Sequence, residues 1–174
     1  IAETGGQNAM IVDATALPEQ VIDDAIASGF GSAGQRCSAL RVMFVQDDVA
    51  GPMLEMLRGA SAELVLGDPM DLATDVGPII DREACAILTA HAEKMAGSGK
   101  TLVDLPLPAA CEQGSFFGPR AYEIDALDIL EREVFGPIIH VIRYGANHLD
   151  DVIDAVNRTG YGIALGIHSR IEAT

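Results

Sequence analysis

The sequence predicts an α/β fold, with a mostly parallel, twisted sheet and helices on both of its faces. Short apolar runs alternate along the chain with stretches whose apolar residues fall on one face of a helix, as in consecutive β-α units. Apolar residues make up 49% of the 174 residues, and the 18 glycines and 8 prolines suit a compact body with many turns. No repeat or linker divides the sequence, so we predict a single domain over residues 1–174.

The first predicted elements are a strand, a helix and a glycine-rich turn. Residues 8–12 predict a short strand, and Pro18 starts a helix because proline is favoured in the first helical turn. The apolar face of this helix consists of Val21, Ile22, Ala25, Ile26 and Phe30. The glycines of residues 29–34 end the helix and form the turn.

A buried strand and a second helix follow. Residues 39–45 are almost continuously apolar, which predicts a strand covered on both faces. Asp47 or Asp48 is expected to cap the next helix. That helix carries the apolar residues Met53, Leu54 and Leu57. The short apolar segment of residues 64–66 ends at a turn, residues 67–69.

A long helix is predicted between Asp81, which is its N-cap, and the glycines at 97 and 99, which stop it. Its apolar side consists of Ala84, Ile87, Leu88, His91 and Met95. Residues 100–105 then predict another strand.

The last third of the chain begins with a loop rich in proline and glycine, residues 106–119, and a short strand near residues 122–124. Residues 138–143 are the best candidate for a central strand, because apolar and β-branched residues dominate them. The following helix carries Leu149, Val152, Ile153 and Val156. Residues 163–167 predict the last strand.

Charge and cysteine content exclude several classes of function. The 26 acidic and 11 basic residues give a net charge of −15, which repels phosphate backbones, so we expect no nucleic-acid partner. No apolar run approaches the roughly 18 residues that a membrane span needs, and no signal peptide is expected. The spacing of Cys37, Cys85 and Cys111 fits neither a disulfide framework nor a metal site. Reduced thiols of this kind are typical of a cytoplasmic protein.

Two glycine-rich segments imitate phosphate-binding loops. Residues 29–34 have the G-x-G-x-x-G spacing, and Glu55 follows at the distance a dinucleotide site would need. The order is wrong, however, since these glycines follow a predicted helix and precede a strand. Residues 97–101 resemble the end of a P-loop but also close a helix. We interpret both segments as helix-terminating loops.

Cys37 is the candidate nucleophile because it lies at the end of a glycine-rich loop that connects a predicted helix to a predicted buried strand. Such a position can present a sulfur to a cleft, and Arg36 with nearby backbone N–H groups could favour the reactive thiolate. The alternative is a small, buried, apolar cysteine. For Cys85 and Cys111 only that alternative applies.

Two acidic segments could also face a cleft. Glu3 precedes Gly5 and Gly6, which allow the backbone to approach a ligand closely, although a surface glutamate would explain it equally well. Residues 131–137 place an acidic pair, an aromatic residue and a Gly-Pro turn before the predicted central strand. They indicate either a ligand site at a strand end or a solvated turn.

Taken together, the motifs resemble the aldehyde dehydrogenase superfamily. The motifs are Glu3-Thr4-Gly5-Gly6, Gly34-Gln35-Arg36-Cys37, Glu133-Val134-Phe135-Gly136-Pro137 and Asn157-Arg158-Thr159-Gly160-Tyr161-Gly162. The segments 34–41, 74–81 and 166–171 are most similar to one branch. That branch is the pyrroline-5-carboxylate dehydrogenase part of bifunctional bacterial proline-utilisation enzymes, which oxidises glutamate semialdehyde to glutamate with NAD.

The resemblance implies a role for each candidate residue. Cys37 matches the nucleophile and Glu3 the general base that activates water. Glu133 and Phe135 match the residues that hold the nicotinamide ribose and the neighbouring ring. Ser38 and the backbone around Gly166 match positions that anchor the carboxylate of the substrate, although a hydroxyl at the start of a strand would also explain Ser38.

The resemblance also implies that the chain is most of a catalytic domain, without the cofactor-binding domain of the family. We therefore expect the isolated fragment to be inactive, and the complete enzyme to act on a small aldehyde as a homodimer. FAD is possible in another domain of the longer protein. Two alternatives stay open: a non-catalytic packing or dimerisation module, and a dehydrogenase for a different aldehyde.

Overall fold

The computed structural model describes residues 5–171 of the chain and contains a six-stranded sheet of order β3-β4-β5-β2-β1-β6. The strands are β1 (Ala9–Val12), β2 (Val42–Gln46), β3 (Lys100–Asp104), β4 (Arg120–Glu123), β5 (Ile138–Tyr144) and β6 (Leu165–His168). Neighbouring strands are parallel, except that β3 runs antiparallel to β4. The predicted mostly parallel sheet is therefore confirmed.

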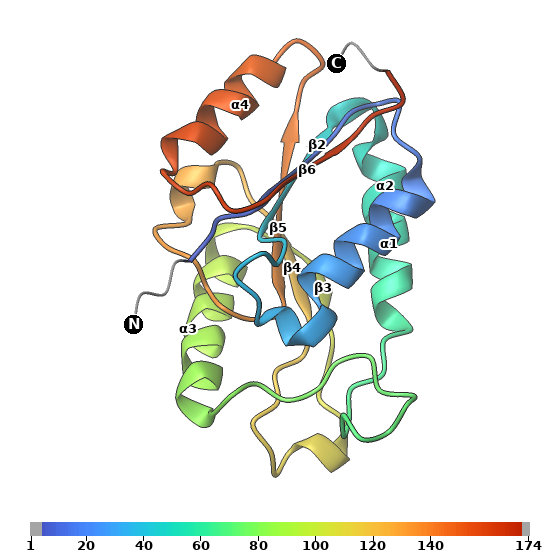
Figure 1. Ribbon diagram of the computed structural model, residues 1–174, viewed down its shortest axis with the longest axis vertical. Coiled ribbons are helices and arrows are strands. Elements are labelled where there is room, and N and C mark those ends of the chain that lie inside the picture. The colour runs from blue at the N-terminus through green and yellow to red at the C-terminus, as the bar shows by residue number, and fades with distance from the viewer. Residues whose placement is uncertain (1–4, 172–174) are drawn as a thin grey trace.

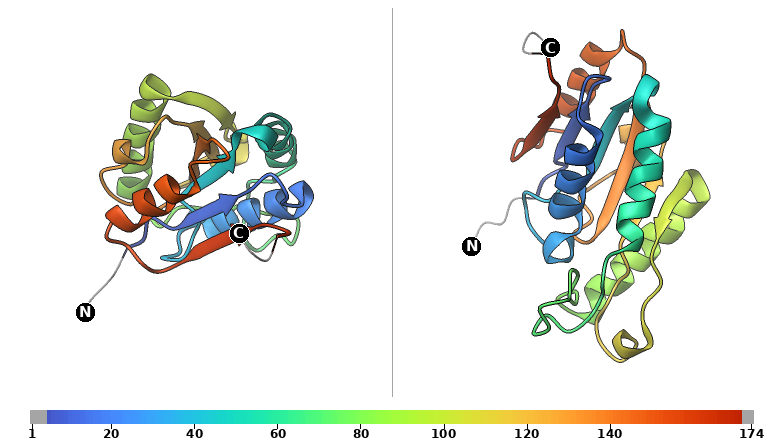
Figure 2. Two further views of the ribbon diagram at one scale, coloured as in Figure 1. Left: turned by 90° about the horizontal axis from the view of Figure 1, so that it is seen from above. Right: turned by 90° about the vertical axis from the view of Figure 1, so that its right-hand side faces the viewer.

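Four helices cover the two faces of the sheet. They are α1 (Pro18–Gly29), α2 (Asp47–Ala62), α3 (Arg82–Ser98) and α4 (Leu149–Arg158). Helices α1 and α2 lie on one face, and α3 and α4 lie on the other (Figures 1 and 2). Short 3₁₀ turns complete the fold at η1 (Gly31–Gly34), η2 (Ala109–Cys111) and η3 (Leu127–Ile129). None of the helices in the described part of the chain is long and apolar enough to cross a membrane.

The core lies between the central strands and these helices. Strand β5 pairs with β2 and β4, which confirms it as a central strand, and all of its residues except Arg143 are buried. An interior strand covered on both faces requires such continuous apolar character. Strand β6 is at the edge, and the Leu165 and Ile167 side chains are 54% and 64% exposed.

The helix boundaries follow local capping chemistry in one case and depart from it in another. Asp81 caps α3 as predicted, since its carboxylate accepts a hydrogen bond of 2.8 Å from the Ala84 amide. The predicted cap of α2 is wrong, because Gln46 is the N-cap and makes no side-chain capping bond. Asp47 and Asp48 lie in the first turn instead, where the helix dipole favours negative charge.

One predicted strand is shorter than expected. The apolar segment of residues 64–66 forms no strand of the sheet, and Leu66 makes only an isolated bridge to Val76. Residues 39–41 are buried but lie outside β2, since the Arg41 amide and the Val42 amide both donate to the single carbonyl of Asn8.

Candidate active site

The candidate site residues meet at the amino-terminal edge of the sheet. Gly6 precedes β1, Cys37 precedes β2 and Glu133 precedes β5, and these strands are parallel neighbours. Ligands of open α/β sheets usually bind outside the carboxyl ends of the strands. The topology therefore gathers the predicted residues at one edge, and it is the edge opposite to the usual one.

A left-handed turn brings the chain from α1 to the candidate nucleophile. Ser32, Ala33 and Gly34 have φ angles of 55°, 52° and 65°, a region that non-glycine residues occupy at a cost of about 1–2 kcal/mol each. A Cβ atom on Gly34 would collide with the backbone of Gly136. The segment ends α1 and precedes β2, which agrees with a helix-terminating loop rather than a dinucleotide loop.

Cys37 is the exposed thiol of the chain, whereas Cys85 is half-buried and Cys111 is buried. The alternative of a buried apolar cysteine is therefore wrong for Cys37 and correct for Cys111. Burial raises the pKa of the Cys85 thiol, and the nearby Asp81 carboxylate raises it further. Accessibility thus singles out Cys37 as the thiol that a small carbonyl compound can reach.

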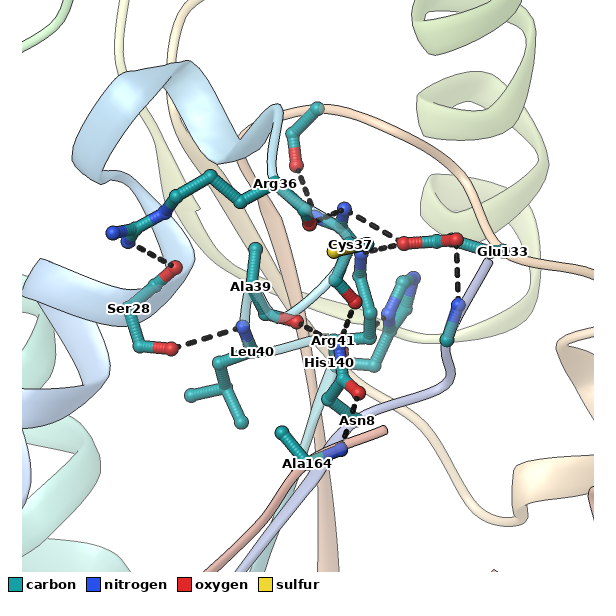
Figure 3. Close-up of polar contacts among 12 residues, drawn as sticks. Asn8, Ser28, Arg36, Cys37, Ala39, Leu40, Arg41, Glu133, His140 and Ala164 are labelled. Atoms are coloured by element: carbon teal, nitrogen blue, oxygen red, sulfur yellow. Dashed lines mark hydrogen bonds and ion pairs between the residues drawn. The ribbon is translucent and has the colours of Figure 1, made fainter. Parts of the chain in front are cut away.

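The sequence analysis expected the positive charge of Arg36 to favour the Cys37 thiolate, but the Arg36 guanidinium contacts α1 instead. Its Nη2 atom donates to the carbonyls of Ala27 and Ser28, at 2.8 and 3.3 Å, near the end of α1. Figure 3 shows this guanidinium turned away from Cys37 and toward Ser28. Arg36 therefore ties the thiol loop to α1, and its positive charge is directed at the helix carbonyls.

Glu133 lies in a buried ion pair (Figure 3). Its Oε1 atom accepts hydrogen bonds from Nε and Nη2 of Arg41, at 3.0 and 2.9 Å, and its Oε2 atom accepts one from the Gly6 amide at 2.7 Å. A Cβ atom on Gly5 would collide with the same Oε2 atom. Within the described residues, the close approach that these glycines allow is therefore an approach to Glu133.

Arg41 is 1% exposed, and sequence reasoning missed it as a site residue. Its Nη1 atom donates to the Gly136 carbonyl at 2.9 Å, and its Nη2 atom donates to the Arg36 carbonyl at 3.3 Å. Burial lowers the pKa of Arg41, and the Glu133 carboxylate opposes this shift. An arginine inside an apolar run was the available signal, since a buried cation needs an anionic partner.

Asn8 is a second residue that the sequence reasoning missed. Its side chain is buried, and Nδ2 donates to the carbonyls of Cys37 and Ala39 at 2.7 and 2.8 Å. Its Oδ1 atom accepts from the Ala164 amide at 3.1 Å. Asn8 therefore connects the thiol loop to the segment that enters β6.

Two histidines lie behind the backbone of Arg41. His140 Nδ1 is 2.9 Å from the Arg41 carbonyl, and the Nε2 atoms of His140 and His91 are 2.9 Å apart. Because a carbonyl can only accept, His140 carries its proton on Nδ1 and receives a hydrogen bond from His91. Burial lowers the pKa of His91 to about 4 and that of His140 to about 3, so both rings are neutral at pH 7.

The other predicted residues are placed as follows. Phe135 is 41% exposed, and its ring centre lies 5.3 Å from the Arg41 guanidinium carbon. Ser38 is exposed beside Cys37. Gly166 lies in the edge strand β6, where it is paired with Met10 of β1. Glu3 lies outside the described residues, and its role stays a prediction.

No group of histidine, cysteine, aspartate and glutamate suited to a metal ion occurs among residues 5–171. The site described above offers instead an exposed thiol, a carboxylate held by an arginine, and an exposed aromatic ring. A thiol of this kind can act as a nucleophile toward a carbonyl carbon.

Comparisons with known proteins give consistent findings. The model described as "Aldehyde dehydrogenase family" matches residues 1–174. The chain is 48% identical over 179 residues to the bifunctional protein PutA of Escherichia coli (strain K12), a match that covers 100% of the chain and 14% of that protein. It is 32% identical over 170 residues to betaine aldehyde dehydrogenase of Agrobacterium fabrum, covering 95% of the chain and 34% of that protein.

Solved structures show the same fold. A mutant of Bradyrhizobium japonicum proline utilization A matches with a TM-score of 0.94 and 53% identity, over 98% of the chain and 17% of that protein. A 1-pyrroline-5-carboxylate dehydrogenase from Thermus with bound NAD matches with a TM-score of 0.86 and 27% identity, over 98% of the chain and 33% of that protein.

Proposed function

Since the chain belongs to the aldehyde dehydrogenase family, we propose that it forms the thiol-bearing part of an NAD-dependent dehydrogenase that oxidises glutamate semialdehyde to glutamate in proline catabolism. Identity of 48% to bifunctional PutA supports this substrate, and a similar pyrroline-5-carboxylate dehydrogenase has been solved with NAD. The chain spans 14% of the length of that PutA. The activity is therefore proposed for the full-length protein.

The observation that carries the proposal is the exposure of the Cys37 thiol within a fixed backbone. The Cys37 carbonyl is held by Asn8, and the preceding Arg36 carbonyl is held by Arg41. A nucleophile anchored on both sides keeps its sulfur in one place while a substrate binds. A module that serves only for packing has no need of an exposed thiol in such a setting.

The proposed reaction begins when the Cys37 thiolate adds to the aldehyde carbon and forms a tetrahedral thiohemiacetal. When bound, NAD would supply the acceptor for the hydride of this carbon. The carbon is then a thioester of Cys37. In our proposal Glu3 removes a proton from water, which attacks the thioester, and the acid and the free thiol are released.

The residues before β5 fit the nicotinamide end of the cofactor. Among the described residues, Glu133 Oε2 accepts one hydrogen bond, from Gly6, and a carboxylate oxygen has a further lone pair for a ribose hydroxyl. Phe135, two residues further along the chain, is 41% exposed. We assign the ribose to Glu133, the neighbouring ring to Phe135, and the carboxylate of the substrate to Ser38 and the backbone near Gly166.

The assembly and location of the full-length protein are also part of the proposal. We propose that it is a homodimer, that it is cytoplasmic, and that any FAD belongs to another domain. Three free cysteines support a reducing compartment.

The test is the replacement Cys37→Ala in the full-length protein, assayed by NADH formation with glutamate semialdehyde. We expect the activity to disappear, because the other two thiols are less accessible. The matched control is Cys85→Ala, which we expect to keep wild-type kcat within about twofold, since surface-proximal changes away from a site have small effects. Turnover by the Cys37→Ala protein would contradict the proposal, and an inactive wild type would favour a packing module.

A further inference from the structure

Resting on the function proposed above, we infer that Arg41 is a positioning residue that sets the thiol loop, the Glu133–Gly136 segment and the Gly5–Gly6 segment relative to one another. None of these segments is adjacent in the sequence, and each carries or adjoins a residue assigned to the reaction. Arg41 itself touches none of the reacting atoms in this assignment. Its contribution is the geometry of the residues that do.

The Arg41 guanidinium uses its planar fork to bind two segments at once. Nε and Nη2 both donate to Glu133 Oε1, at 3.0 and 2.9 Å. Nη1 donates to the Gly136 carbonyl at 2.9 Å, and Nη2 also donates to the Arg36 carbonyl at 3.3 Å. One side chain therefore fixes both ends of the Glu133–Gly136 segment and the residue before the nucleophile.

Glu133 extends this connection to a third segment. Its Oε2 atom accepts from the Gly6 amide at 2.7 Å, and a Cβ atom on Gly6 would lie 3.0 Å from the Cys37 carbonyl oxygen. The backbone around Gly6 is thus enclosed between Glu133 and the thiol loop. Gly6 follows the proposed base, Glu3, by three positions in the sequence.

The backbone of Arg41 is fixed as firmly as its side chain. Its amide donates to the Asn8 carbonyl at 3.0 Å, and its carbonyl accepts from the His140 amide at 2.8 Å. The His140 ring adds a contact of 2.9 Å to that carbonyl. Because its backbone amide and carbonyl are both hydrogen-bonded, Arg41 holds its guanidinium in one position, and the surrounding loops bind to it there.

The shape of the guanidinium matters, as well as its charge. Lysine presents a compact ammonium on a flexible stem, which cannot reach Glu133, Gly136 and Arg36 together in one plane. A lysine would also change the contact of the Arg41 guanidinium carbon with the Phe135 ring, whose centre is 5.3 Å away. We therefore expect Arg41→Lys to keep the buried ion pair and to loosen the relative placement of the segments.

The experiment compares Arg41→Lys and Arg41→Gln with wild type in the full-length protein. We measure kcat, KM for NAD and the rate at which iodoacetamide alkylates Cys37. We expect Arg41→Lys to lower kcat/KM for NAD by about 10²-fold, the scale of a displacement of about 1 Å. We expect the alkylation rate to change by less than about threefold, since the thiol itself stays exposed. Arg41→Gln leaves Glu133 without its cationic partner. We expect this variant to lower kcat/KM for NAD further than Arg41→Lys does, and to change the alkylation rate of Cys37 more.

Two controls separate positioning from general stability. Arg120→Lys changes another arginine that pairs with a carboxylate, Asp104 at 3.1 Å, and faces a ring, Phe117 at 5.1 Å. Ile139→Val removes a buried methyl group from β5 and so lowers stability without touching the Arg41 contacts. Both should keep kcat/KM for NAD within about threefold of wild type.

Wild-type kinetics in Arg41→Lys would overturn the inference, and so would an equal loss in Ile139→Val, because the effect would then be one of stability. Failure of the proposed function gives a different result, namely activity in the Cys37→Ala protein. An inactive Cys37→Ala protein with a fully active Arg41→Lys protein leaves the function intact and refutes the positioning role alone.

Discussion

At the residue scale, the roles proposed for the Cys37 thiol and the Glu3 carboxylate are separable by kinetics. Replacement of Glu3 by glutamine removes the base and leaves the nucleophile. We expect one fast equivalent of NADH per active site, followed by turnover about 10²- to 10⁴-fold slower than in wild type. Stopped-flow absorbance measures both phases. Uniform slowing of the first turnover and the later ones would refute Glu3 as the base of thioester hydrolysis.

Asn8 is the residue whose loss tests how the thiol loop is held. Asn8→Ala leaves the carbonyls of Cys37 and Ala39 without their shared donor, at a cost of about 1–3 kcal/mol for each buried group left unpaired. We expect faster hydrogen exchange in peptides covering residues 36–40 and 162–166. Gln46→Ala, an amide at the start of α2, is the control and should leave those peptides unchanged. Unaltered exchange in Asn8→Ala would contradict the proposal that the Asn8 side chain holds the thiol loop.

At the element scale, the left-handed turn η1 depends on the absence of a side chain at one position. Gly34→Ala would collide with the Gly136 backbone and strain a φ angle of 65°. We expect loss of activity and less soluble protein. Gly59→Ala, in α2 with nothing within 4 Å of the added Cβ, should instead stabilise by about 0.5–1 kcal/mol. Equal behaviour of the two variants in thermal unfolding would contradict this account of the turn.

The contact between α3 and β5 should make stability depend on pH. Burial holds the pKa of His91 at about 4 and that of His140 at about 3, below the value of about 6.5 in an unfolded chain. Between pH 6.5 and 4 the unfolded state therefore binds more protons, and the free energy of unfolding falls as the pH falls. Above pH 6.5 this dependence disappears.

Hydrogen exchange of the full-length protein at pH 7.5 and 5.0, corrected for intrinsic rates, measures this effect in peptides from α3 and β5. We expect their protection to fall at pH 5.0. His91→Gln keeps a hydrogen-bond donor for His140, and we expect it to lose less protection at pH 5.0 than wild type. The control His148→Asn changes an exposed histidine, and we expect it to lose as much protection as wild type. The same loss of protection in wild type and His91→Gln would argue against the His91 ring as its source.

At the scale of the whole molecule, the sequence predicted what depends on local patterns. Apolar periodicity gave β5 and α3, and the capping aspartate gave the start of α3. The resemblance of four motifs to a family identified Cys37 and Glu133 as candidate site residues.

The network around the site was not predictable from local patterns, because its partners are far apart in the chain. Arg41 and Glu133 are 92 positions apart, and Asn8 and Ala164 are 156 positions apart. Only the parallel order of β1, β2 and β5 brings these segments to one edge. The buried polar residues at the starts of strands were the signal of this network, since each of them requires a partner.

We propose that catalysis by the full-length protein depends on the Cys37 thiol at the amino-terminal edge of the sheet. Partial alkylation of the full-length protein with iodoacetamide at neutral pH, with peptide mass spectrometry of Cys37, Cys85 and Cys111, tests it most directly. We predict that Cys37 is labelled first and that the fraction of activity lost equals the fraction of Cys37 modified. Activity that survives complete modification of Cys37, or that falls with the labelling of Cys85 or Cys111, would contradict the account.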